Sequence, residues 1–198
     1  MLDVYISSVT SQLSVLLVGD EINIFKKIED KDFLIELPEI FDNDDIKNIF
    51  KNNILKNVVI LSEVGKLTGM RIGEAFAKGL VLGDDGNKII KLNPHDVLSF
   101  SVKSDKRILS ILKIRKNSYS LSLFLHKNNF KRLSKNFELS GEQVSSFIKK
   151  NEFFIVGEGG RDFDRNLDEK FLFPDALKMY EYKRGLYGKS DGFDSRVQ

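Results

Sequence analysis

The 198-residue chain contains no cysteine, which excludes a disulfide framework, a thiol nucleophile and every cysteine-ligated metal site. It contains only two histidines, His95 and His126, too few for a multi-histidine metal centre. Tryptophan is absent, and proline and alanine each occur three times. Because alanine is the best helix former, its scarcity argues against a bundle of long helices. These absences exclude several classes of enzyme and one class of fold.

Long hydrophobic runs are also missing. The longest, such as Val15–Val18, fall far short of the ~20 residues that a membrane span needs. The first twelve residues have no basic segment followed by an apolar one, so we expect no secretory signal. We therefore predict no membrane partner and a cytoplasmic location, or an intracellular or virion location if the chain is encoded by a virus or phage.

Charge is the most uneven property of the chain. The formal net charge is only +2, yet residues 1–50 carry −7, residues 51–102 carry +2, residues 103–150 carry +9 and residues 151–198 carry −2. A basic stretch of this size is typical of a protein that binds a polyanion. An alternative is that the basic stretch docks on the acidic N-terminal segment of the same chain or of a neighbouring copy.

Alternating apolar residues and turn signals predict an α+β fold with a largely antiparallel meander, two to four short helices and a C-terminal arm. The strands that we expect are 14–18, 22–27, 33–37, 58–61, 79–83, 88–92, 97–103, 107–116, 118–126, 137–139 and 153–156. The helices that we expect are 46–53, 70–78, 141–151 and 174–184. Turns are predicted at 19–21, 84–87 and 117–118, and fraying at 190–198.

The domain organisation that we predict is an α+β body over residues 1–157 and an arm over residues 158–198, with a short helix near 174–184. Residues 46–53 and 144–151 share a faint similarity. Each of these two segments follows predicted strands, so the body could consist of two strand–strand–strand–helix repeats. Chance similarity in a chain rich in lysine and asparagine is the alternative.

Two glycine-containing segments look like nucleotide-binding loops but lack the residues those loops need. At residues 65–66, Gly-Lys is followed by Leu67 rather than serine or threonine, and Ile60 stands where the first glycine belongs. The glycines of residues 157–160 follow an apolar strand, but Asp162 occupies the third glycine position. Neither histidine has a serine or cysteine elbow beside it in the sequence. We therefore predict no catalytic residue, no metal and no cofactor.

The predicted meander offers the most promising surface. Alternation over residues 118–126 places Phe124 and His126 on one face of their strand, and Lys113 and Arg115 share a face of the preceding strand. If those faces align, aromatic rings could stack on bases while cations contact phosphates. An equal alternative is that Phe124 belongs to a second core layer. The predicted nucleic-acid-binding residues are Lys113, Arg115, Lys116, Tyr119, Phe124, His126, Lys127, Phe130, Lys131, Arg132 and Lys135.

The segment Ser134–Lys149 resembles a strand-to-helix junction found in the Whirly and Pur-alpha superfamily of single-stranded nucleic-acid-binding proteins. There, a basic meander ends in an apolar–x–Leu–Ser/Thr strand, followed by Glu-Gln and a packing helix. The resemblance covers residues 107–151. It implies a curved antiparallel sheet, binding of single strands on the sheet face, and dimers or larger rings.

From charge, pattern and resemblance together, we predict a non-enzymatic protein that binds single-stranded DNA or RNA through a basic β-meander. The alternative is a structural or assembly component of a viral, phage or other multi-protein particle, in which the acidic segment of one copy meets the basic meander of another. A homo-oligomer or an assembly partner is expected in either case.

Overall fold

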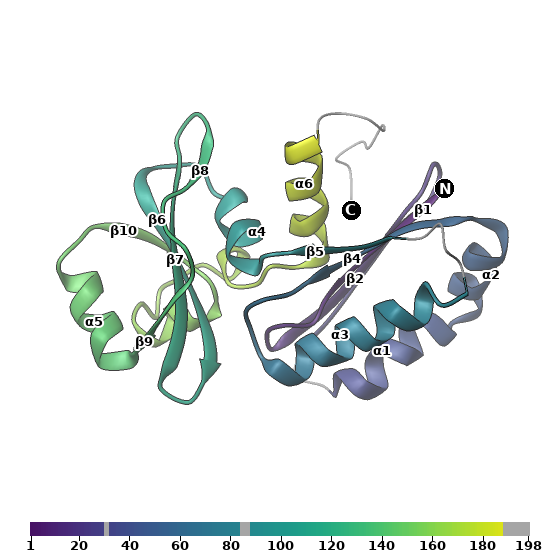
Figure 1. Cartoon of the computed structure of the whole chain (residues 1–198), viewed down its shortest axis with the longest axis horizontal. Coiled ribbons are helices and arrows are strands. Elements are labelled where there is room, and N and C mark those ends of the chain that lie inside the picture. The colour runs from purple at the N-terminus through teal and green to yellow at the C-terminus, as the bar shows by residue number, and fades with distance from the viewer. Residues whose placement is uncertain (30–31, 84–87, 188–198) are drawn as a thin grey trace.

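The structure is a computed structural model that describes residues 1–29, 32–83 and 88–187. The chain forms two lobes, each built on a five-stranded sheet (Figure 1). The first lobe contains β1 (Leu2–Ser7), β2 (Gln12–Val18), β3 (Asn23–Glu29), α1 (Phe33–Asp42), α2 (Asp44–Asn52), β4 (Leu55–Leu61), α3 (Leu67–Leu80) and β5 (Lys88–Leu92). The rest of the chain contains α4 (Pro94–Phe100), β6 (Ser104–Arg115), β7 (Ser118–His126), β8 (Phe130–Arg132), β9 (Phe137–Ser140), α5 (Gly141–Lys149), β10 (Phe153–Val156), η1 (Glu158–Asp162), η2 (Glu169–Phe171) and α6 (Ala176–Tyr187).

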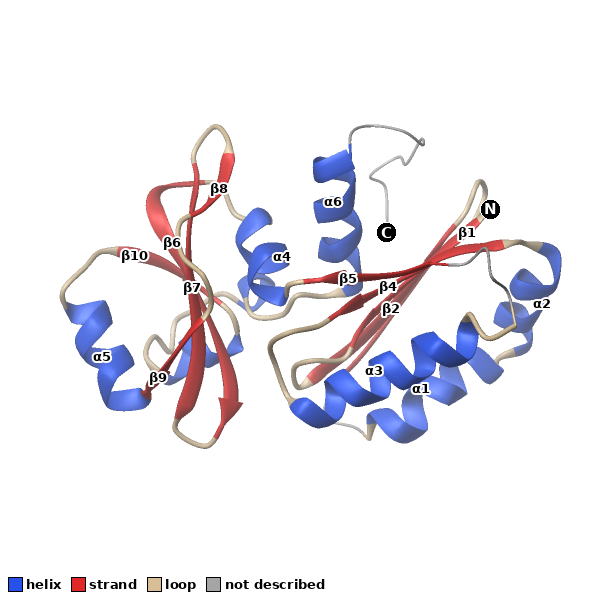
Figure 2. Cartoon of the chain, viewed as in Figure 1, coloured by secondary structure: helices blue, strands red, loops and turns tan. Residues whose placement is uncertain are grey.

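The first sheet is mixed and buried on both faces. Its strand order is β3-β2-β1-β4-β5, with β1, β2 and β3 antiparallel and β1, β4 and β5 parallel. Successive side chains of a strand point to opposite faces. Val4 and Ile6 therefore pack toward α1, α2 and α3, whereas Tyr5 packs toward α6. Figure 2 shows the three helices lying together along one side of this sheet.

The second sheet is also covered on both faces. Strands β10, β6, β7 and β8 are neighbours in that order, and β9 pairs with β7. Ile108 and Phe124 face α4, whereas Leu109 and Leu121 face α5. The pairing of β10 with β6 is parallel and the other pairings are antiparallel.

The predicted fold class is therefore confirmed as α+β, but the prediction of a largely antiparallel meander is wrong because both sheets are mixed. The parallel pairs join β1 to β4, β4 to β5 and β6 to β10, and long segments of chain separate the two strands of each pair. Turn residues indicate hairpins between strands that are adjacent in the sequence, so they do not predict these parallel pairs. The strands predicted at 14–18, 22–27 and 58–61 are confirmed, as are the helices predicted at 70–78 and 141–151, the second of which ends at Lys149.

Three predicted strands are wrong. Residues 33–37 open α1, where Asp32 accepts a hydrogen bond from the backbone nitrogen of Leu34 and caps the helix. Residues 97–100 belong to α4, which begins with Asn93 as N-cap and Pro94 in the first turn. Residues 79–80 end α3. The strand β1 was not predicted. The turn predicted at 84–87 and the fraying at 190–198 lie outside the described residues.

In the described part of the chain, no helix combines the length and the apolar composition that crossing a membrane requires.

The C-terminal segment returns to the first lobe and fills its second core layer. Ala176 and Met179 are fully buried, and the backbone nitrogen of Ala176 donates to Oγ of Ser14. Ser7 Oγ donates to the carbonyl oxygen of Pro174. The division into a body over residues 1–157 and an arm over residues 158–198 remains a prediction.

Met179→Ala tests how much this segment contributes to stability. Truncating a fully buried methionine leaves a cavity, so we expect the free energy of unfolding to fall by about 2–5 kcal/mol in urea titrations. The exposed Leu82, which is 86% accessible, provides the control Leu82→Ala, for which no change is expected. A loss below about 0.5 kcal/mol for Met179→Ala would mean that the arm adds little to the core.

Candidate functional site

The register between β6 and β7 separates the residues that were predicted to share one surface. Lys113 pairs with Tyr119 and Ile108 pairs with Phe124, and paired residues point to the same face. Lys113 therefore lies on the α5 side of the sheet and Phe124 on the α4 side. The expected alignment of both Lys113 and Arg115 with Phe124 and His126 is wrong, because an irregularity between Lys113 and Arg115 leaves Lys113 on the opposite face while Arg115 pairs with Ser118 on the face of Phe124.

The aromatic residues of the predicted surface lie in the interior. Phe124 is fully buried and its ring stacks on Phe130 at 5.4 Å, so the alternative of a second core layer is the one that the structure shows. His126 is 7% exposed and stacks on Phe100 at 5.3 Å. Tyr119 is 5% exposed. A buried ring cannot stack on a base, so Phe124, His126 and Tyr119 form no open aromatic platform. Phe130 is half-buried and packs against Phe124 and His126.

The predicted cations are scattered, and several are paired within the chain. Lys113 Nζ lies 2.7 Å from Asp162 Oδ2, and the hydroxyl of Tyr119 donates to the same oxygen at 2.5 Å. Burial and the neighbouring Asp162 raise the pKa of Tyr119 to about 12. Lys127 pairs with Asp105 at 3.0 Å. Lys127 is nevertheless exposed, as are Arg115, Lys116, Lys131 and Lys135. Their individual roles as nucleic-acid contacts stay predictions that no observation tests.

His95 has serine neighbours that the sequence order conceals. Its Nδ1 lies 2.8 Å from Ser110 Oγ and its Nε2 lies 2.9 Å from Ser120 Oγ. The imidazole is completely buried between α4 and the second sheet. Burial, with a smaller effect of the positive charge on Arg132, lowers the pKa of His95 to about 3. A neutral imidazole enclosed in this way fastens α4 to the sheet and has no access to a substrate.

An apolar groove on the outer side of the first lobe is the stronger candidate for a functional surface. It has a volume of about 370 Å³, and its lining residues come from α1 and α3. The residues that line it are Leu34, Pro38, Ile72, Ala75, Phe76, Gly79 and Leu80. Leu34 is 62% exposed, and the adjacent Ile35 is 57% exposed. Exposed apolar surface that is concentrated in one groove marks an interaction site more often than isolated surface residues do.

The sequence carried a signal for this groove. The residues from α3 are at positions 72, 75, 76, 79 and 80, the i, i+3, i+4, i+7, i+8 spacing of one helix face. Helix α1 has phenylalanine, leucine or isoleucine at six of its ten positions, so it is apolar beyond the face that the sheet covers. Reading residues 33–37 as a strand concealed this excess.

The charges beside the groove differ between its two sides. Helix α1 carries Glu36, Glu39 and Asp42 and no basic residue. Helix α3 carries Arg71, Glu74 and Lys78, and Glu74 pairs with Lys78 at 3.3 Å. The α1 side is therefore acidic and the α3 side is nearly balanced.

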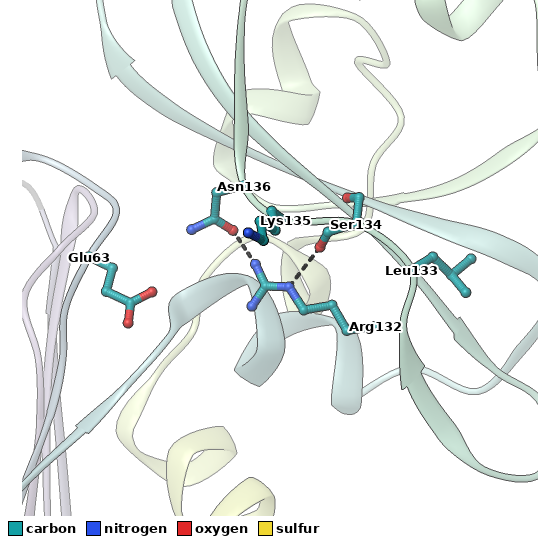
Figure 3. Close-up of a pocket in the computed structure, with 6 residues that line it drawn as sticks. All are labelled: Glu63, Arg132, Leu133, Ser134, Lys135 and Asn136. Carbon is teal, nitrogen blue, oxygen red and sulfur yellow. Dashed lines mark hydrogen bonds between the residues drawn. The ribbon is translucent and has the colours of Figure 1, made fainter.

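A second, polar pocket of about 540 Å³ lies between the lobes (Figure 3). It is lined by Glu63, Arg132, Leu133, Ser134, Lys135 and Asn136. Arg132 and Lys135 were predicted from the sequence as phosphate contacts, and the structure brings these two together. Glu63 was not predicted, because it lies about seventy residues away in the sequence and reaches the pocket only through the non-local fold.

The comparisons with known proteins identify the fold. No family model matches the sequence, and no curated protein matches it. The solved structure of YeaZ from Pseudomonas aeruginosa aligns with a TM-score of 0.72 and 14% identity, covering 94% of this chain and 93% of that chain. A protein described as uncharacterized, with similarity to the peptidase YeaZ from Pseudomonas aeruginosa, aligns with the same score and identity over 94% and 91%. The chain thus has the YeaZ fold.

The match to YeaZ contradicts four of the predictions made from the sequence. The resemblance to the Whirly and Pur-alpha superfamily is wrong, because the structure matches YeaZ-like proteins over almost its whole length. The predicted functions, single-stranded nucleic-acid binding and particle assembly, are wrong for the same reason, and so are the predicted DNA or RNA partners. The prediction of a non-enzymatic protein is also overturned, since one matching structure is described by its similarity to a peptidase.

Proposed function

We propose that this chain works by binding a second, non-identical protein of the same fold through the groove between α1 and α3. The observation that supports this proposal best is the exposed apolar lining of the groove, in which Leu34 is 62% accessible to solvent. Covering one leucine side chain completely contributes ~1.5–3 kcal/mol, so a few such residues provide the central part of an interface.

The shape of the groove favours a non-identical partner. Its walls include the small residues Ala75 and Gly79, which make this part of the surface concave. Two copies related by a two-fold axis would place one concavity against the other and enclose empty space, which close-packed interfaces avoid. The occupant therefore needs a convex ridge, such as a helix with large apolar side chains facing Ala75 and Gly79.

A protein of the same fold supplies a suitable element. A protein that shares this fold would carry helices equivalent to α1 and α3 on the outer side of its first sheet, where they lie in this chain (Figure 2). Two helix layers packed face to face give the four-helix arrangement that soluble proteins use widely. Because α1 carries no basic residue and remains acidic at Glu39 even with Asp42 paired to Lys47 of α2, the partner helix beside it should carry lysine or arginine next to its apolar stripe.

Co-expression with the non-identical YeaZ-fold proteins of the source genome tests the proposal. We expect one of them to form a 1:1 complex that is stable in size-exclusion chromatography with light scattering. Leu34→Asp and Ala75→Glu should each weaken this complex at least about thirtyfold, because they place a charge in the centre of the interface. Both positions are exposed, so the variants should remain folded.

Leu82→Asp is the matched control. Leu82 is 86% exposed and lies in the same lobe but outside the groove, so the same chemical change should leave the complex intact. The proposal is wrong if the chain stays monomeric with every such protein or pairs only with itself. Equal weakening by Leu34→Asp and Leu82→Asp would also contradict it.

A further inference from the structure

The polar pocket between the lobes has an accessible charge of each sign on facing walls. Glu63 belongs to the loop after β4 in the first lobe, and Lys135 belongs to the segment between β8 and β9 in the second. Both residues are exposed. Figure 3 shows Glu63 across the gap from Arg132 and Asn136. A ligand in this pocket would therefore contact both lobes at once.

Arg132 shapes the pocket, and each of its guanidinium nitrogens already donates a hydrogen bond within the chain. Its Nη1 donates to Asp96 at 2.9 and 3.1 Å, its Nε donates to the carbonyl oxygen of Ser134 at 2.8 Å, and its Nη2 donates to Asn136 Oδ1. Each guanidinium nitrogen thus has an acceptor from the chain. Arg132 fixes residues 132–136 against α4 and holds the second wall in place.

Lys135 and Glu63 keep the capacity to bind a ligand. Among the residues that the structure describes, Lys135 has no ion pair. Glu63 accepts a hydrogen bond from Asn93 Nδ2 at 2.7 Å through Oε2, and within the same residues its Oε1 has no donor. The Asn93 contact orients the carboxylate without using all of its acceptor sites.

The backbone of Glu63 is strained where it meets the pocket. Its φ is 75°, in the left-handed region that residues with a side chain rarely adopt. Such strain persists only where the surroundings impose it, and it collects at ligand-binding positions. Here the loop is held between β4 and α3, and Ser62 donates its backbone N–H to the carbonyl oxygen of Leu92 at 3.0 Å. The carboxylate is thus presented by a fixed loop.

We propose that this pocket binds a small zwitterion of the amino-acid class, with its ammonium group on Glu63 and its carboxylate on Lys135. A simple anion would leave the Glu63 carboxylate facing it, and a simple cation would face both Arg132 and Lys135. A ligand with one charge of each sign satisfies both walls. The volume of about 540 Å³ exceeds the needs of the smallest amino acids and leaves room for a longer side chain beside the exposed Leu133.

Calorimetric titration of the full chain tests the proposal with two sets of probes. The first set is the twenty standard amino acids. The second is a series of linear ω-amino acids, in which the distance between ammonium and carboxylate grows by one methylene at a time. We expect affinity to peak at one charge separation, because the two walls are fixed. N-acetylated and carboxamide analogues of the best ligand should bind at least about tenfold more weakly, since each lacks one charge.

Variants that remove one charge show which group of the ligand contacts Lys135 and which contacts Glu63. Lys135→Gln should weaken binding of the best zwitterion about tenfold or more but leave the affinity for its carboxamide analogue unchanged. Glu63→Gln should also weaken binding of the best zwitterion about tenfold or more, but it should leave the affinity for the N-acetyl analogue unchanged. Lys131→Gln and Glu138→Gln are the controls, because both residues are exposed and lie outside the pocket lining. These controls should bind like the unaltered chain.

Several results would overturn the proposal. One is the absence of any zwitterion that binds with a Kd below about 10 mM. Another is equal binding of singly charged analogues, which would indicate an anion or cation site. A third is a Lys135→Gln variant that remains folded by circular dichroism and binds the best ligand like the unaltered chain.

Discussion

Gly69→Ala is expected to destabilise the protein by about 3 kcal/mol or more, the largest effect of any single methyl group that we predict. A Cβ atom at this position would lie 1.7 Å from the carbonyl oxygen of Ser8 and 2.9 Å from its carbonyl carbon. Both are backbone atoms of the turn between β1 and β2, so no side-chain rotation can relieve the overlap. Helix α3 would have to move away from the sheet.

The close approach of α3 depends on small residues spaced four apart. Gly69, Gly73 and Ala77 are all buried and lie on the face of α3 that packs against the first sheet and the turn at Ser8. Ser8 Oγ donates to the carbonyl oxygen of Gly69 at 2.8 Å, which ties the helix to the turn. A displaced helix would lose this hydrogen bond and would also alter the groove between α1 and α3.

Gly79→Ala is the matched control for this prediction. Gly79 lies in the last turn of the same helix, and a Cβ built there meets nothing within 4 Å. Because alanine favours helices more than glycine does, this substitution should raise the free energy of unfolding by up to about 1 kcal/mol. Urea titrations of both variants measure the contrast. A Gly69→Ala variant as stable as the unaltered chain would mean that the turn at Ser8 yields easily.

Local features of the fold were predictable because their signals are contained in a few adjacent residues. Ser140 caps α5 in a capping box with Gln143, a pattern that the sequence displays directly. The hairpin of β6 and β7 turns at Asn117, whose φ of 57° suits asparagine. Asn93-Pro94 is an equally local signal for a helix start, yet the apolar residues that follow it suggested a strand.

The two sites were not predictable in the same way, because each needs contacts that are distant in the sequence. Glu63 and Lys135 come from different lobes and meet only after both sheets have formed. The basic stretch was read as a single surface, but the β6–β7 register divides it between two covered faces. Charge composition supports statements about possible partners, whereas the position of each cation depends on strand pairing.

Acid is expected to destabilise the protein through His95. The imidazole is neutral in the folded chain, with its pKa lowered to about 3 by burial and by the charge on Arg132, whereas an unfolded histidine titrates near ~6.5. Between these values the unfolded chain binds a proton that the folded chain does not. Stability is therefore fully present above pH ~6.5 and falls as the pH decreases toward 3, by up to ~1.4 kcal/mol per unit.

The expected loss from this residue alone is about 2 kcal/mol between neutral pH and about pH 5. His95→Gln separates this effect from the titration of carboxylates, because glutamine keeps a donor and an acceptor for Ser110 and Ser120 but does not titrate. Urea titrations at several pH values should show that the variant loses about 2 kcal/mol less than the unaltered chain over this range.

Should His95→Gln prove too unstable to study, the unaltered chain still provides a direct measurement. It has only two histidines, so the NMR spectrum contains two sets of imidazole signals, and a His126→Gln variant identifies the set that belongs to His95. The His95 imidazole resonances should remain those of the neutral ring from neutral pH down to about pH 4, for as long as the protein stays folded. Protonation of His95 near pH 6.5 in the folded state would contradict the prediction, because a ring held between Ser110, Ser120 and the core cannot take up a charge without opening the contact between α4 and the second sheet.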